Sequence, residues 1–405
     1  MEREIIMKMS NLIKAIDITV QSGSVPMVMG HSGIGKSSIA KIYADLIQER
    51  ENKDVVYVEL FGSVLKEGEL TGMPINITKN YSGEELNVTT YTIHTAIRKL
   101  WEANEAGKIP LLFLDELNRS DIAVQQELMQ LILTKQINGN PLPENTIMIA
   151  AGNPDSEDDD GIDYQVNTMN YALRDRFTDL HLEVDSDEWI KWALQQVSFY
   201  DNDDNLIKTD SMIHKNIIEF ITNDPLQLHI INAENEGKNP TPRAWERTSD
   251  AYRYFEENYD MEDSDNKRAF WGVVEGNLGK NTAIAFRSFI EENSKPMINP
   301  KTIINNKDLS KDTKLIEKIK NETMARQNLL TRYVYIHIGN NIDKFKEKEL
   351  NNFITYLDII PEELLMMAIS EIKRNPNDNI SSIFEILKTN QTFIQKFVNI
   401  IQNLK

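Results

Sequence analysis

The residues best suited to chemistry lie in the segment Gly30–Ser37, which reads GHSGIGKS. They fit the phosphate-binding loop G-x-x-x-x-G-K-[S/T], with Gly30, Gly35, Lys36 and Ser37 at the fixed positions. An apolar run precedes the loop and a helix-forming run follows it, which is the strand–loop–helix context that the motif requires. Backbone N–H groups of such a loop close around phosphates, and the helix N-terminus adds positive potential. The segment therefore predicts a nucleotide site rather than an ordinary glycine-rich turn.

We expect the whole loop and the residue after it to bind the cofactor. Lys36 is placed to reach the β- and γ-phosphates, and the hydroxyl of Ser37 is placed to ligate Mg²⁺. ATP and Mg²⁺ are therefore the expected cofactors. The expected cofactor-binding residues are Gly30, His31, Ser32, Gly33, Ile34, Gly35, Lys36, Ser37 and Ser38.

Two carboxylates end a second apolar run, at Asp115 and Glu116. Asp115 is expected to hold the Mg²⁺ shell together with Ser37. Glu116 is expected to polarise the attacking water as a general base. Acidic residues are also favourable at an ordinary helix start after a core strand. The position of this pair downstream of a phosphate loop favours the catalytic interpretation.

Four further polar residues are candidates for catalysis, and the residues alone leave an alternative open for each. Asn153 follows an apolar run, where it would orient water or touch the γ-phosphate, or serve as a turn residue. Arg174 and Arg176 precede the last predicted strand. There, one of them would stabilise phosphoryl transfer in a neighbouring chain, or make a surface ion pair. Arg243 begins a later helix, where a solvated arginine is the simpler explanation.

Composition and charge narrow the class of protein. The 405 residues carry a formal net charge of -19, with 40% hydrophobic residues, 26% charged residues and no cysteine. These values fit a globular protein of two or three domains without disulfides or thiolate metal sites. No apolar run reaches about 18 residues, and no signal peptide is evident, so we expect a cytoplasmic protein without a membrane contact. The acidic balance disfavours nucleic acid as a partner.

The hydrophobic pattern predicts three regions. Residues 1–186 alternate strands with helices such as Ala123–Leu133, which predicts an α/β nucleotide-binding core. Residues 187–292 are predicted to be helical throughout, with Thr241 capping one helix. Residues 293–405 are predicted to form further helices of unknown role, among them Asp312–Arg332 and Leu364–Arg374. The expected strands are Val25–Met29, Val55–Phe61, Leu111–Asp115, Thr146–Ala151 and Thr178–Val184.

Three segments fall between these elements. Met73–Ile93 contains Asn-Tyr-Ser-Gly between β-rich flanks, and Ile137–Leu142 contains Asn-Gly, so both are predicted hairpins. The acidic run 155–160 reads DSEDDD and is predicted to be a solvated surface loop, with a cation or partner site as the alternative.

The motifs, taken in their order along the chain, resemble those of AAA+ ATPases, and their details resemble the MoxR-like branch. The resemblance covers roughly residues 10–290. Residues 187–193 also resemble a subgroup whose genes are commonly paired with von Willebrand factor A-type or metallopeptidase-like proteins. The segments that carry the resemblance are ELTGMP at Glu69–Pro74, LDELNRS at Leu114–Ser120, AAGNP at Ala150–Pro154, ALRDRF at Ala172–Phe177 and TPRAW at Thr241–Trp245.

This resemblance implies a five-stranded parallel core, a helical lid and a homo-oligomeric ring, commonly a hexamer, with ATP between protomers. The resemblance also implies that Asn153 and Arg243 are the first and second sensor residues, which contact the γ-phosphate. Arg176 becomes the preferred finger that completes the neighbour's site, with Arg174 as the alternative. Arg119 is a further candidate for action across that interface.

The function expected from the resemblance is Mg²⁺-dependent ATP hydrolysis coupled to remodelling of a protein partner. The partner class it suggests is a von Willebrand factor A-type or metallopeptidase-like protein. One alternative is a nucleic-acid motor of replication or restriction type, which includes GTP-using members. Another is a nucleotide-gated scaffold that does not hydrolyse.

Overall fold

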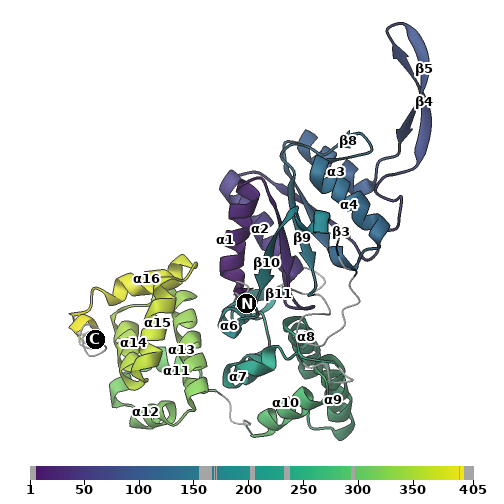
Figure 1. Ribbon diagram of the computed structural model, residues 1–405. Helices are drawn as coiled ribbons and strands as arrows, with labels where there is room; N and C mark the ends of the chain where they lie inside the picture. The colour runs from purple at the N-terminus through teal and green to yellow at the C-terminus, as the bar shows by residue number, and fades with distance from the viewer. Residues whose placement is uncertain are drawn as a thin grey trace. The chain divides into compact units, whose positions relative to one another are not determined.

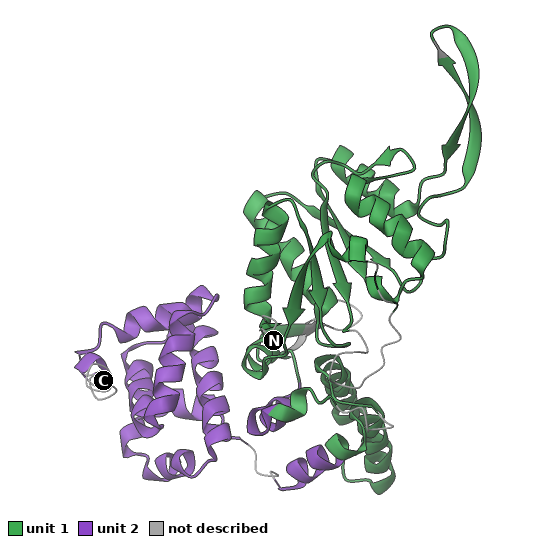
Figure 2. Cartoon of the chain, in the orientation of Figure 1, with its two compact units in different colours: residues 1–213, 226–283 green, residues 214–225, 284–405 purple. Residues whose placement is uncertain are grey.

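The computed structural model describes residues 6–154, 167, 169, 171–200, 206–231, 238–292, 297–391 and 393–395 (Figure 1). The chain forms two compact units, residues 1–213 with 226–283 and residues 214–225 with 284–405 (Figure 2). The acidic run 155–160 lies outside the described residues. The division by compactness does not test the domain boundaries expected at residues 186 and 292, which stay predictions.

A parallel sheet of six strands forms the centre of the first unit, in the order β1-β10-β2-β9-β6-β3. The five expected strands are all present. The sixth, β1, pairs Ile6 with His181 and Met7 with Leu182 at the edge of the sheet, and two residues are too few to produce an apolar run. The strands are β1 (Ile6–Met7), β2 (Val25–Met29), β3 (Val55–Phe61), β6 (Ile109–Asp115), β9 (Ile147–Gly152) and β10 (Phe177–Leu182).

Helices cover both faces of this sheet, as the continuous apolar strands predict. Alternation along β6 sends Leu112 and Leu114 into a core with α3 and α4, and Leu111 and Phe113 into a core with α1 and α2. Burial on two faces fixes the register of β6 and so the position of the residue that ends it, Asp115. The helices are α1 (Met9–Gln21), α2 (Lys36–Glu51), α3 (Thr95–Glu105) and α4 (Ile122–Thr134).

Two predicted hairpins are confirmed. The first joins β4 (Pro74–Tyr81) to β5 (Glu84–Tyr91), and the second joins β7 (Gln136–Ile137) to β8 (Asn140–Pro141). Both turns place two residues at positive φ, at Ser82-Gly83 and Asn138-Gly139, as a tight two-residue turn requires.

The expectation of helices throughout residues 187–292 is wrong at one place. The helix α6 (Ser186–Ala193) ends early, and β11 (Gln196–Tyr200) and β12 (Leu206–Ser211) form an antiparallel hairpin behind it. Short β-rich runs such as Val-Ser-Phe-Tyr carry too little periodicity to separate strand from helix. The predicted cap is confirmed, because the Thr241 hydroxyl accepts a hydrogen bond from the backbone N–H of Ala244. Further elements before residue 279 are η1 (Leu117–Arg119), α5 (Tyr171–Arg174), η2 (Pro225–Leu228), α8 (Pro242–Asn258) and α9 (Ser264–Leu278).

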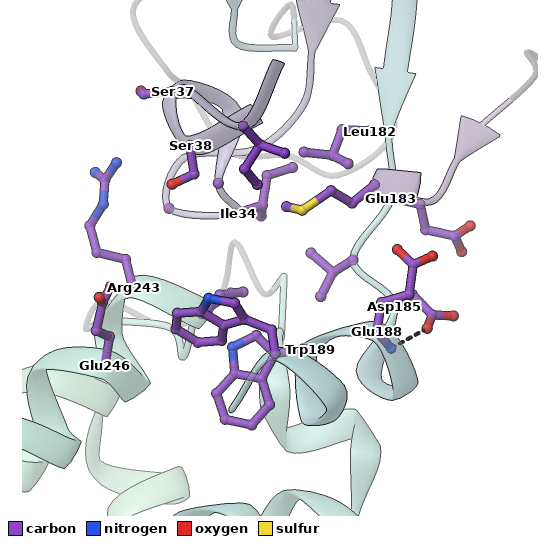
Figure 3. A pocket seen from close by; sticks show the side chains of 17 residues that line it. Ile34, Ser37, Ser38, Leu182, Glu183, Asp185, Glu188, Trp189, Arg243 and Glu246 are labelled. Atoms are coloured by element: carbon purple, nitrogen blue, oxygen red, sulfur yellow. Dashed lines mark hydrogen bonds between the residues drawn. The ribbon is translucent and has the colours of Figure 1, made fainter. Parts of the chain in front are cut away.

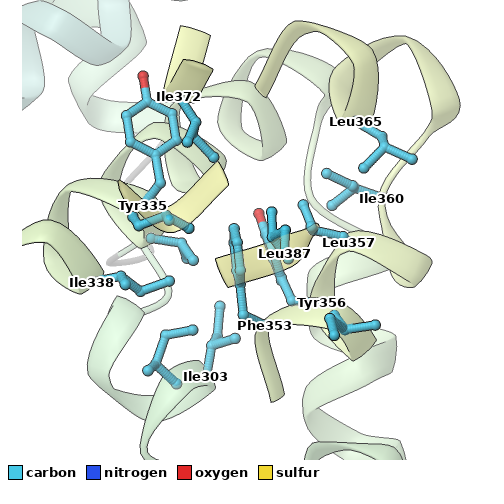
Figure 4. Packing of buried hydrophobic residues seen from close by; sticks show 14 of the residues in the cluster. Ile303, Tyr335, Ile338, Phe353, Tyr356, Leu357, Ile360, Leu365, Ile372 and Leu387 are labelled. Carbon is cyan, nitrogen blue, oxygen red and sulfur yellow. The ribbon is translucent and has the colours of Figure 1, made fainter. Parts of the chain in front are cut away.

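The second unit is helical, and its apolar core includes Tyr335, Phe353, Tyr356 and Leu387 (Figure 4). The prediction of one helix over 312–332 is wrong, because the chain breaks there into two helices and Thr323 caps the second. The helix α10 (Lys280–Glu292) begins in the first unit and continues into the second from Ile284. The other elements described in the second unit are α7 (Lys215–Asn223), α11 (Pro300–Ile304), η3 (Leu309–Lys311), α12 (Thr313–Lys320), α13 (Met324–Gly339), η4 (Ile342–Lys344), α14 (Glu347–Ile359), α15 (Glu362–Lys373) and α16 (Asp378–Leu387). Among the helices described, none is long and apolar enough to span a bilayer.

Candidate nucleotide-binding site

The loop between β2 and α2 closes tightly because its glycines lie where a side chain would not fit. Gly33 and Gly35 have φ of 81° and 104°, the left-handed region that favours glycine. A Cβ at Gly33 would lie 2.8 Å from Oγ1 of Thr241, and one at Gly30 would lie 2.6 Å from Cδ1 of Ile34. The positive φ of Gly33 and Gly35, and the close approach of Thr241 to Gly33, therefore favour glycine at these two positions.

Lys36 is buried at the start of α2 and faces across the loop. Its Nζ donates hydrogen bonds to the carbonyl oxygens of Gly30 (2.5 Å) and His31 (2.9 Å) and to Oδ1 of Asn153 (2.8 Å). Burial lowers the pKa of Lys36 to about 8; the carboxylate of Asp115 works against this shift, and the nearby charge of Arg243 adds to it. An anion bound beside this ammonium group would raise the pKa of Lys36 again and favour its charged form.

The two expected Mg²⁺ ligands lie side by side. The Ser37 hydroxyl donates to Oδ2 of Asp115 at 2.7 Å, and Oδ1 of Asp115 accepts from the backbone N–H of Glu116 at 2.8 Å. A hydroxyl and a carboxylate supply the hard oxygen donors that Mg²⁺ prefers, alongside substrate phosphates. The residues present therefore fit Mg²⁺.

Glu116 sits in a constrained position directly after β6. Its φ is 51°, in the left-handed region that is uncommon for a residue with a side chain. Its Oε2 accepts from the hydroxyl of Ser63 at 2.5 Å, and its Oε1 accepts from Nη1 of Arg119 at 2.9 Å. Both carboxylate oxygens are therefore engaged in this state.

Ser63 is a site residue that the sequence did not reveal. It lies two residues beyond the end of β3, and the pairing of Phe61 with Asp115 brings it beside Glu116. The backbone N–H of Gly62 donates to the carbonyl oxygen of Asp115 at 2.8 Å, which holds the end of β3 against the end of β6. Only the order of strands in the sheet creates this contact.

One cavity joins these groups at the carboxyl ends of the strands. It is lined by the phosphate loop, by Asp115 and Glu116, and by Asn153 and Arg243. Glu59 on β3 also lines it, and burial, followed by the charge of Asp115, raises its pKa. Ligands of open parallel sheets bind at this end of the strands. We call it the phosphate cavity.

A second, largely apolar pocket lies on the other side of the loop (Figure 3). Figure 3 shows Arg243 and Glu246 on one side of it and Asp185 and Glu188 on the other. Apolar walls with a few polar groups at the edge suit a nucleotide base. We call it the base pocket; its apolar lining residues include Met9, Ile34, Ile42, Leu182, Trp189 and Trp192.

The first residues of α1, with Lys8 before them, close one side of the base pocket. Lys8 forms an ion pair with Asp185 at 2.5 Å, and the hydrogen bond to this carboxylate, followed by its charge, raises the pKa of the lysine. The backbone N–H and the hydroxyl of Ser10 both donate to the carboxylate of Glu188. Met9 is therefore held against the pocket between two polar contacts.

The structure separates the candidate arginines. Arg243 lines both cavities, and its backbone N–H donates to the carbonyl of Gly33 at 3.1 Å. Arg174 and Arg176 are exposed and line neither cavity, and Arg174 pairs with Asp179 at 3.1 Å. The fold thus brings Arg243 to the site of its own chain and leaves the other two at the surface.

The remaining polar residues of the loop segment are His31, Ser32 and Ser38. The His31 ring lies 5.5 Å from the ring of His229, measured between centroids, and Ser32 lines the phosphate cavity. Ser38 lines the base pocket.

The fold and this site define a P-loop nucleotide-binding protein. Residues 26–177 match the family model described as the AAA domain, dynein-related subfamily. These residues, more than a third of the chain, are therefore similar to the AAA domain of AAA+ ATPases. The match includes the loop, Asp115, Glu116 and Asn153, and it confirms the α/β fold class and the AAA+ resemblance.

The chain is also similar to solved structures at low identity. A mutant form of RuvB from Thermotoga maritima is 16% identical with a TM-score of 0.36, over 74% of this chain and 82% of that one. NtrX from Brucella abortus is 14% identical with a TM-score of 0.38, over 91% and 69%. NtrX in complex with ADP is 12% identical, with the same TM-score and coverage. No curated protein matches the chain significantly.

Proposed function

We propose that this chain is a MoxR-like AAA+ ATPase that hydrolyses ATP to ADP and phosphate with Mg²⁺. The observation that carries the proposal is the convergence of the loop lysine, Asp115 and Glu116 on one cavity. A nucleotide-binding module without hydrolysis has no need of a carboxylate held beside the metal ligands.

In this proposal the residues of the phosphate cavity have separate roles in binding phosphate, binding metal and accepting a proton. The loop N–H groups and Lys36 bind the phosphates, and Ser37 with Asp115 would hold Mg²⁺. Bound Mg²⁺ neutralises charge on the β- and γ-phosphates. Glu116 accepts a proton from the attacking water once it exchanges one of its two present hydrogen bonds for that water. Asn153 orients the water or touches the γ-phosphate.

We propose further that the active species is a homo-oligomeric ring, hexameric as is common in the family. Arg176, or Arg174 in its place, completes the site of the neighbouring protomer, with Arg119 also near that interface. Their exposure outside both cavities supports a role toward another chain. The second sensor, Arg243, acts within its own chain.

The output that we propose is remodelling of a protein partner in the cytoplasm. The partner class suggested by the resemblance is a von Willebrand factor A-type or metallopeptidase-like protein. The formal net charge of -19 speaks against nucleic acid in that role.

Phosphate release measured against protein concentration tests the proposal. Activity per protomer should rise with concentration, and Glu116→Gln should abolish it while ATP binding persists. Mixing equal amounts of Arg176→Ala and Glu116→Gln protein should restore about one quarter of wild-type activity. The reason is that about a quarter of the interfaces then combine an intact Glu116 with an intact Arg176.

Three outcomes contradict parts of this proposal. Inactive mixtures overturn the trans role of Arg176, and the same mixture with Arg174→Ala then tests the alternative. Turnover stimulated by DNA, with salt-sensitive binding, points to the nucleic-acid motor, and a preference for GTP points to its restriction-type members. Oligomers that bind ATP and release no phosphate, with or without a partner protein, point to the scaffold.

A further inference from the structure

Asn118 lies in the short turn η1, two residues after Glu116, and is 5% exposed. Its side-chain Nδ2 donates to the carbonyl oxygen of Asn153 at 2.7 Å, and its Oδ1 accepts from the backbone N–H of Asn153 at 3.1 Å. One primary amide thus satisfies both backbone groups of Asn153, the residue that directly follows β9. A flipped amide would face oxygen with oxygen and nitrogen with nitrogen, so this pattern defines its orientation.

The residue held in this way is itself a site residue. Asn153 is 3% exposed, and its Oδ1 accepts from Nζ of Lys36 at 2.8 Å. A continuous path of hydrogen bonds therefore runs from Asn118 through Asn153 to Lys36. Since Asn118 and Glu116 share one turn, this path also ties the lysine to the segment that carries the general base.

Close packing leaves the amide little freedom. A Cβ at Gly152 would lie 2.9 Å from Oδ1 of Asn118, so the amide rests directly on the backbone of β9. The other side of the turn is anchored separately. The backbone N–H of Asn167 donates to the carbonyl of Asn118 at 2.8 Å, and Nδ2 of Asn167 donates to the carbonyl of Ser120 at 3.0 Å.

We propose that Asn118 is a positioning residue, which fixes Asn153 and through it Lys36 relative to Glu116. The inference rests on the proposed function of the phosphate cavity and adds a residue to it. Asn118 touches neither cavity, so it acts through Asn153 and not on the nucleotide. Without the Asn118 amide, two buried backbone groups of Asn153 lose their partners. The side chain of Asn153, which accepts a hydrogen bond from Lys36, then loses its fixed orientation.

The test separates this inference from hydrolysis by using nucleotide binding. In a Glu116→Gln background, the ratio of the Kd for ADP to the Kd for ATP reports contact with the γ-phosphate. Asn118→Ala and Asn153→Ala should each reduce this ratio about tenfold or more, with the affinity for ADP changed less than about threefold. The double variant should be no worse than Asn153→Ala alone, within about twofold, because both act on one path.

In the otherwise wild-type chain, Asn118→Ala and Asn153→Ala should each lower kcat with little change in KM. The double variant should have a kcat no lower than that of Asn153→Ala alone, within about twofold. Asn167→Ala is the matched control, because it removes a hydrogen bond to the same turn without touching Asn153. It should leave both readouts within about twofold. If Asn118→Ala does not fold, Asn118→Ser provides a smaller polar replacement, and its thermal unfolding is measured first.

Multiplicative effects of the two alanine variants would overturn the inference, since Asn118 would then act independently of Asn153. If Asn167→Ala reduced the Kd ratio and kcat as much as Asn118→Ala does, the inference would also be overturned. The effect would then come from the rigidity of the turn as a whole. A wild-type chain that binds ATP in preference to ADP but releases no phosphate refutes hydrolysis and leaves the binding test of Asn118 intact.

Discussion

The lowered pKa of Lys36 makes the affinity for nucleotide depend on pH. With the pKa near 8 in the free protein, about three quarters of the lysine is charged at pH 7.5 and about one tenth at pH 9.0. Phosphates beside the ammonium group favour its charged form, so the pKa rises on binding. Binding therefore takes up a proton above pH 8, and affinity falls as pH rises through that value.

The size of the effect follows from these fractions. The apparent Kd scales with one plus ten to the power of pH minus pKa, so it rises about eightfold between pH 7.5 and 9.0, or roughly 1.2 kcal/mol. ADP binding without Mg²⁺, followed by calorimetry in buffers of different ionisation enthalpy, measures both the affinity and the proton uptake. This choice of ligand keeps metal ionisation out of the measurement.

Lys36→Arg is the control, because its guanidinium stays charged over this range. Its affinity, weaker or not, should change less than about twofold with pH. A wild-type affinity that is flat between pH 7.5 and 9.0 would refute the reasoning, because Lys36 would then keep its charge despite its burial. A pH dependence of equal size in Lys36→Arg would place the titrating group elsewhere.

Further predictions concern single contacts. Glu116→Gln should lower kcat at least about 100-fold, with ATP affinity kept, in a phosphate-release assay; turnover above a tenth of wild type would remove Glu116 as the base. Ser63→Ala removes one hydrogen bond that engages this carboxylate and should raise basal kcat, by at most about tenfold; a fall instead would show that Ser63 supports catalysis. Gly33→Ala places a Cβ at positive φ against Thr241 and should weaken ATP binding at least about tenfold in a fluorescence titration, whereas unchanged binding would show that the loop relaxes. Phe353→Ala in the second unit should cost about 3–5 kcal/mol of unfolding free energy by urea denaturation, and a loss under about 1 kcal/mol would contradict tight packing there.

Much of the fold could be predicted, and particular elements show why. The runs Val25–Met29 and Val55–Phe61 match strands β2 and β3 to the residue, because buried parallel strands are continuous apolar runs bounded by polar residues. The two tight turns were recognisable because only a few residue types accept positive φ. Elements with a weak local signal were missed: the two-residue β1, the β11–β12 hairpin, and the break between α12 and α13 at Thr323.

Local sequence patterns predict the phosphate loop, the Asp115–Glu116 pair and the strands that end at them. Each is a local pattern, in which residue type and spacing decide backbone geometry within a few positions. No such pattern predicts that Ser63 contacts Glu116, or that Asn118 contacts Asn153, 35 residues away along the chain; these contacts form only in the folded protein. These contacts arise from the order in which β3, β6 and β9 pair. The free energy that selects this order comes from burying both faces of the sheet, which no short stretch of sequence contains.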